Sequence, residues 1–131
     1  MKHAYGALKT ILTWQKHLMT YQDVAQRFGD LIARKDYSAA WKLLSKEAQI
    51  SITPEAIRAA EATMLASAPG PILEAQVMDD CVVEDWPGKQ QSDLAVVYVA
   101  LTGESFSEAV TLTLAQYGQD TLIRHLEWGR P

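Results

Sequence analysis

Apolar residues in the first half of the chain recur at the spacing expected for amphipathic α-helices. The clearest segment begins after Thr20 and ends near residue 37. Thr20 and Asp23 have the spacing of a capping box, in which each side chain binds the backbone N–H of the other residue. The apolar positions of this segment are Tyr21, Ala25, Phe28 and Ile32. Because they follow the ~3.6-residue period of a helix, we expect them to face a hydrophobic core.

Two further helices are predicted before residue 70. Asp36 is expected to cap the second helix. The apolar stripe of that helix consists of Tyr37, Ala40, Trp41 and Leu44. Thr53 is expected to cap the third helix, with Pro54 at the first position, where a missing N–H costs no helical hydrogen bond. The predicted inner face of the third helix contains Ile57, Ala60 and Met64, and the sequence SAPGP ends it.

From Ile72 onward the apolar residues alternate with polar ones, which is typical of β-strands. Four strands are predicted, over residues 72–86, 94–101, 107–117 and 121–129. The second is apolar nearly throughout, so we expect a central strand covered on both faces. Helices followed by an antiparallel meander indicate an α+β fold. In this fold we expect three N-terminal helices to pack on one face of a curved four-stranded sheet.

Residues 1–19 precede these predicted helices and strands, and residues 20–131 form the predicted domain. The apolar residues Leu8, Ile11, Leu12 and Leu18 favour an N-terminal helical extension. A second interpretation also stays open, in which the natural start is the sequence MTYQDVAQRF at Met19 and the preceding residues are an addition.

The charge of the chain is unevenly distributed. The 131 residues carry a formal net charge of −4, and no basic residue lies between Arg58 and Lys89. A net negative chain lacks the basic face that nucleic-acid phosphates require. No stretch approaches the ~20 apolar residues of a membrane span. The basic N-terminal tip lacks the cleavage site of a secretory signal. We therefore expect a cytoplasmic protein with no nucleic-acid partner and no membrane association.

Cys81 is the single cysteine, which excludes an internal disulfide and fits a reducing compartment. Its acidic and apolar neighbours raise the pKa of a thiol, so a buried structural cysteine is predicted. The three histidines and this cysteine lack metal-ligand spacing, and no glycine-rich phosphate loop is present. The sequence therefore predicts neither a metal nor an organic cofactor.

Several motifs resemble the nuclear transport factor 2-like (cystatin-like cone) superfamily. The specific carriers lie in the sequence FGDLIARKDYSAAWKLLS and are Phe28, Asp36, Tyr37, Ala40 and Leu44. The closing sequence SEAVTLTLAQYGQDTLIRHLEWGRP is similar to that of small bacterial members, some of which are immunity proteins paired with secreted toxins. The resemblance covers residues 20–131 and implies a cone formed by helices on a curved sheet. Function differs widely within this fold.

The enzymes of that superfamily bury an aspartate base beside a tyrosine or histidine. Tyr98 is the one polar candidate on the inward side of the second predicted strand. Asp79 and Asp80 are adjacent in the first predicted strand, so only one of them could point into the cone. The sequence therefore predicts no catalytic residue.

The last predicted strand places two sets of side chains on opposite faces. Leu122, Arg124, Leu126 and Trp128 form the more apolar set and are expected to point inward, whereas Ile123, His125 and Glu127 are expected outside. For Arg124 the favoured interpretation is a structural pair with an acid of the first strand. The alternative is a lining role in an anion-binding pocket, with Tyr98 and Trp128 as further lining residues.

Two functions remain after these exclusions. The first is a non-catalytic protein-binding module, such as an immunity protein, whose acidic residues Asp79, Asp80, Glu84 and Asp85 meet a protein partner with a basic surface. The same acids could instead protect a solvated edge from aggregation. The alternative function is a small-molecule enzyme or carrier of the ketosteroid isomerase or cyclase type. A homodimer that uses the outer face of the sheet is a third interpretation.

Overall fold

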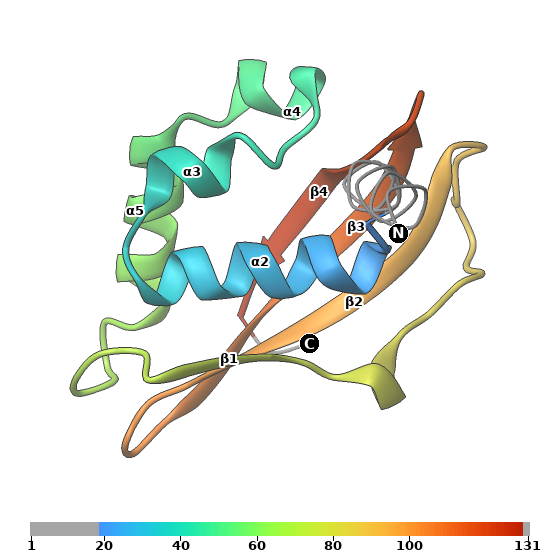
Figure 1. Ribbon diagram of the computed structural model, residues 1–131. Helices are drawn as coiled ribbons and strands as arrows, with labels where there is room; N and C mark the ends of the chain where they lie inside the picture. Colours follow the sequence, from blue (N-terminus) through green and yellow to red (C-terminus); the bar gives the residue numbers. More distant parts are fainter. Residues whose placement is uncertain (1–18, 130–131) are drawn as a thin grey trace, which may run out of the picture.

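The computed structural model describes residues 19–129, which form helices on one side of a single open sheet (Figure 1). The helices are α2 (Tyr21–Ala33), α3 (Tyr37–Trp41), α4 (Lys46–Ser51) and α5 (Pro54–Met64). The antiparallel strands β1 (Glu74–Val77), β2 (Asp93–Thr102), β3 (Ser107–Tyr117) and β4 (Asp120–Trp128) lie in the order β1-β2-β3-β4. The α+β fold is confirmed. The prediction for residues 1–19 lies, apart from Met19, outside the described residues.

Helix α2 begins and packs as its sequence predicts. The capping box of Thr20 and Asp23 is present in both directions. The inner face of the helix contacts all four strands and lies directly against the sheet at Gly29. A Cβ atom at this position would come within 2.8 Å of the Val99 side chain and 2.9 Å of the Ala75 Cβ. Glycine is therefore required here for the close approach of helix and sheet.

The second predicted helix is divided in two, so the described residues form four α-helices before the sheet and not three. Asp36 caps α3 as expected, but α3 ends at Trp41. The chain then runs beside β4, where the Ser45 N–H donates to the Ile123 carbonyl at 2.8 Å and the Ile123 N–H donates to the Leu43 carbonyl at 2.9 Å. The Ser45 N–H and the Leu43 carbonyl thus bond to Ile123 and not to helical partners, whereas the Leu44 N–H still donates to the Trp41 carbonyl at 3.0 Å. The Ser45 hydroxyl then caps α4, which the sequence analysis missed.

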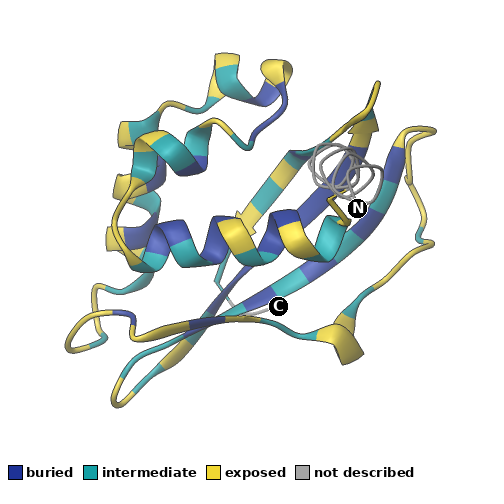
Figure 2. Ribbon diagram, in the orientation of Figure 1, coloured by how far each residue is buried: buried dark blue, intermediate teal, exposed yellow. Residues whose placement is uncertain are grey.

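The hydrophobic core lies between the helices and the sheet. Strand β2 is central, and its inner residues are fully buried: Ala95, Val97, Val99 and Leu101. The alternate residues on its outer face are only half-buried (Figure 2). The predicted central position is confirmed, whereas the predicted cover on both faces is wrong for residues 19–129, because the α-helices of this part lie on one side of the sheet (Figure 1).

The first predicted strand is much shorter than residues 72–86. Val77 pairs with Val99, and the next bridge joins Val83 to Val96. From Val77 to Val83 the chain advances by six residues, whereas β2 advances by three from Val99 to Val96. About three residues of the first segment must therefore leave the sheet. They form the short 3-10 helix η1 (Asp79–Cys81), where the Cys81 N–H donates to the Met78 carbonyl at 2.9 Å.

Strand β4 contains a bulge that reverses part of its predicted alternation. Thr113 pairs with His125 and Leu114 pairs with Ile123, so Arg124 is an extra residue on β4. Ile123 is consequently fully buried, which corrects its predicted outward position. Leu126 and Trp128 pack against the core as expected. His125 and Glu127 lie on the surface as predicted, with 3.4 Å between His125 Nε2 and Glu127 Oε1.

Candidate functional site

Residues 79–85, here called the acidic loop, carry the four carboxylates predicted to bind a partner. Asp79, Asp80, Glu84 and Asp85 are all exposed. Asp79 and Asp80 lie in η1 and not in a strand, so their predicted placement on opposite faces of a sheet is wrong. The loop therefore presents both aspartates outside the sheet.

The acidic loop is held against the body of the protein. Val83 and Val96 exchange two backbone hydrogen bonds, of 3.0 and 2.8 Å. The Tyr21 hydroxyl donates to Glu84 Oε2 at 2.7 Å. This hydrogen bond, together with partial burial and the charge of Glu84, raises the pKa of Tyr21. The loop thus begins on η1, is fastened to β2 and is tied to the start of α2.

Apolar and sulfur-containing groups are exposed among these carboxylates. The Val83 residue is 42 % exposed. Cys81 is also exposed, which corrects the predicted buried cysteine. The reason is the departure of η1 from the sheet, which carries Cys81 away from the core.

The three residues predicted to line a pocket lie in separate places. Tyr98 alternates with the buried residues of β2 and therefore lies on the outer face, which corrects its predicted inward direction. Trp128 lies on the inner face, with its ring centroid 6.3 Å from that of Phe28. Arg124 lies at the β4 edge. The structure does not bring these three side chains together.

Arg124 forms an ion pair with a buried carboxylate. Its Nε atom donates to Asp93 Oδ1 at 2.6 Å, and its Nη2 atom donates to Asp93 Oδ2 at 2.8 Å. The predicted structural pair is present, but its partner lies at the start of β2 and not in the first strand. Burial raises the pKa of Asp93, but the hydrogen bonds from Arg124 and from the Gln90 N–H outweigh it, so the net pKa lies below its ordinary value.

A second buried carboxylate, Glu61, was missed by the sequence analysis. Only 3 % of the residue is exposed, and its Oε2 atom has no hydrogen-bond partner among the described residues. The Tyr37 hydroxyl donates to Oε1, and Lys35 Nζ lies 4.0 Å from that atom. Burial and the hydrogen bond to Glu61 raise the pKa of Tyr37.

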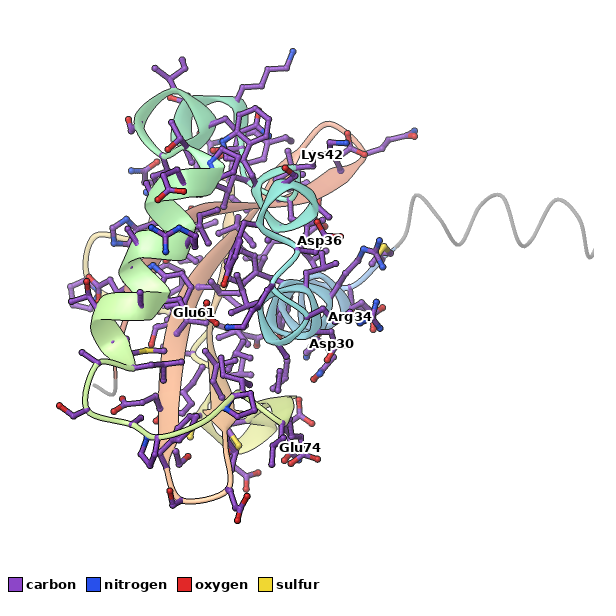
Figure 3. All side chains as sticks on the ribbon, turned by 90° about the vertical axis from the view of Figure 1, so that its left-hand side faces the viewer. Asp30, Arg34, Asp36, Lys42, Glu61 and Glu74 are labelled. Atoms are coloured by element: carbon purple, nitrogen blue, oxygen red, sulfur yellow. The ribbon has the colours of Figure 1, made fainter. Side chains whose placement is uncertain are left out.

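Glu61 lies between α5 and the end of α2 (Figure 3). Asp30 and Arg34 lie on the other side of α2 in this view. The Tyr37–Glu61 pair joins α3 to α5, and we interpret it as a structural contact. The spacing of residues along the helix could have revealed that Glu61 is buried, because Glu61 follows Ile57 by four residues and lies on the same buried face.

A hollow of about 310 Å³ lies between α4 and the β4 edge, beside Arg124. Gln90 and His125 also line it. Within residues 19–129, no three histidine, cysteine or acidic side chains gather as metal ligands would. In the same part of the chain, every helix is too short or too polar to cross a membrane.

Comparisons of the chain with protein-family models, with curated proteins and with solved structures found no match.

Proposed function

We propose that this chain is a protein-binding module that uses the acidic loop to bind a basic surface of a partner protein. The observation that carries the proposal is the fixed display of four exposed carboxylates, Asp79, Asp80, Glu84 and Asp85. Such a surface attracts a basic partner over several ångströms and increases the association rate.

The anchoring of the loop supports this function over a merely solvated edge. An edge needs only charge to resist pairing with another strand, whereas binding gains affinity when the contact surface is ordered beforehand. The Tyr21–Glu84 hydrogen bond and the Val83–Val96 bridge supply that order. The exposed Val83 adds an apolar side chain to the charged surface, and protein interfaces commonly combine the two.

The finer proposal is an immunity protein with a nuclear transport factor 2-like cone. The packing of α2 across one face of the open sheet and the parallel bridge between Leu44 and Ile123 support the helix-covered sheet that such a cone requires. The inner face holds closely packed apolar side chains, including the contact of Phe28 with Trp128. This packing favours a binding module over an isomerase or cyclase.

The test is co-production of the full chain with the products of neighbouring genes, followed by co-purification and kinetic binding measurements. We expect a toxin-like basic product to be retained and its toxicity to be suppressed. The triple variant D79N/D80N/D85N keeps Glu84 and its contact with Tyr21, and should slow association roughly tenfold or more at low salt.

The matched control is E104Q/D120N/E127Q, which removes the same number of exposed carboxylates from other parts of the surface. It should bind its partner at nearly the wild-type rate. If no neighbouring product binds at low salt, or if both triple variants bind equally well, the proposed function is wrong.

A further inference from the structure

We propose that the hollow beside Arg124 is a binding site for a small monocarboxylate. The site is separate from the acidic loop, since none of its lining residues belongs to residues 79–85. We call this hollow the Arg124 hollow. It has a volume of about 310 Å³, at the lower end of the range for small-molecule sites. Its lining includes Ala48 and Ile52 of α4 together with Gln90, Arg124 and His125.

The orientation of Arg124 is fixed before any ligand arrives. Asp93 has a fully buried side chain and accepts hydrogen bonds from Arg124 and from the Gln90 N–H, the latter at 2.8 Å. The bulge places Arg124 out of the regular pairing with β3. A buried carboxylate and a strand bulge therefore hold a guanidinium at the wall of a hollow, which is how an anion-binding arginine is commonly preorganised.

The ion pair leaves part of the guanidinium outside it. Arginine has five N–H donors, and the pair with Asp93 uses one on Nε and one on Nη2. The Nη1 group and the second hydrogen of Nη2 form another edge of the same planar group. That edge has the two parallel donors that match the two oxygens of a carboxylate. The side chain is 26 % exposed, so solvent reaches it.

The charges around the hollow decide which anion fits. Asp93 already compensates much of the Arg124 charge, and Glu47 also lines the hollow. A dianion such as hydrogen phosphate would meet two carboxylates with one guanidinium. A monocarboxylate needs one charge partner, and its apolar body can lie against Ala48 and Ile52. The imidazole of His125, which also lines the hollow, can add one N–H donor.

Benzoate is the probe for this site, and benzamide is its neutral control of similar size. We expect benzoate titrated into the ¹⁵N-labelled full chain to give saturable shifts at the Arg124 side chain and at the amides of Ala48, Gln90 and His125. Benzamide should give shifts at least fivefold smaller at equal concentration. Inorganic phosphate should bind more weakly than benzoate.

Two variants separate binding from folding. R124K keeps a cation but lacks the second edge of the guanidinium, and should weaken benzoate binding about tenfold. E47Q leaves the Arg124–Asp93 pair intact and should tighten binding two- to threefold, because a repelling charge is removed. D79N/D80N/D85N should bind benzoate as the wild type does, so failure of the acidic-loop proposal would not affect this one.

The proposal is overturned if 50 mM benzoate gives no saturable shift in the wild-type chain. It is equally overturned if benzamide matches benzoate, if the shifts map away from the Arg124 hollow, or if phosphate binds more tightly than benzoate. Weaker binding by E47Q would also contradict the charge argument.

Discussion

The two edges of the sheet are protected by different means. At the β1 edge, the Gln26 side chain of α2 binds backbone groups of the strand. Its Nε2 atom donates to the Ala75 carbonyl at 2.7 Å, and its Oε1 atom accepts from the Val77 N–H at 3.0 Å. A side-chain amide thus takes the place of a peptide group in a neighbouring strand. At the β4 edge, backbone groups of residues 43–45 pair with Ile123, and the bulge at Arg124 follows.

The difference shows where each edge derives its stability. The β1 edge depends on neutral hydrogen bonds to one exposed strand, which contribute modestly to the free energy of unfolding. The β4 edge depends on the ion pair between Arg124 and the buried carboxylate of Asp93, so losing either partner leaves the other charge without its ion pair. Both edges resist pairing with another chain, but we expect damage at the β4 edge to cost more.

The largest effect is expected from D93N. Asparagine keeps the size of the side chain but leaves the half-buried Arg124 unpaired, so the free energy of unfolding should fall by about 3 kcal/mol. Urea denaturation measures it. E127Q removes the exposed partner of His125 and should change stability little, because surface pairs are weak. Equal losses in both variants would contradict the difference between buried and exposed pairs.

The pH dependence of stability should report the same ion pair. The folded-state pKa of Asp93 lies below its ordinary value of 3.8. Its contribution is therefore complete above that ordinary pKa and is lost as the pH falls through the lower folded value. Urea denaturation from about pH 6 down to about pH 2.5 should show a steeper acid loss in the wild type than in D93N. Parallel curves would show that Asp93 does not carry this dependence.

A smaller effect is expected from Q26A at the β1 edge. Loss of its two hydrogen bonds to β1 should lower the free energy of unfolding by about 1–2 kcal/mol. The freed backbone groups should also permit edge-to-edge association, which sedimentation velocity at increasing concentration would detect. Q22A, on the same helix, is the control. Its free energy of unfolding and its association state should match those of the wild type. A monomeric Q26A variant would show that the amide is not what protects the edge.

The smallest effect is expected from Y21F. The lost hydrogen bond to the exposed Glu84 should cost less than about 1 kcal/mol. Its local effect should be clearer, since hydrogen exchange at the amides of Val83 and Val96 should become faster while β3 is unchanged. Unchanged exchange at both amides would mean that the backbone bridge alone holds the acidic loop.

Local sequence signals predicted the ends of the helices better than the course of the strands. The caps at Thr20, Asp36 and Thr53 were correct because each depends on residues within three positions. The division of the second helix depends on Ile123, far away in sequence, whose backbone competes for residues 43–45. Alternation could not show this competition.

The candidate sites were predicted only where they depend on residues that are close together in sequence. Exposed acids can be read from composition, and the acidic loop was found this way. The partner of Arg124 could not be, because a bulge in β4 and the pairing of three strands bring Asp93 to it. Alternation from Ala95 to Leu101 does place Asp93 on the buried face of β2, and this was the signal available.

The glycine at position 29 determines how much free volume the interior can contain. Because α2 meets Val99 and Ala75 there without a side chain of its own between them, the helix lies closer to the sheet than a residue with a Cβ atom would allow. A larger residue would act as a spacer and lift the helix away from β2. Engineering a ligand chamber into this protein would therefore begin by enlarging one residue, and not by hollowing out the core.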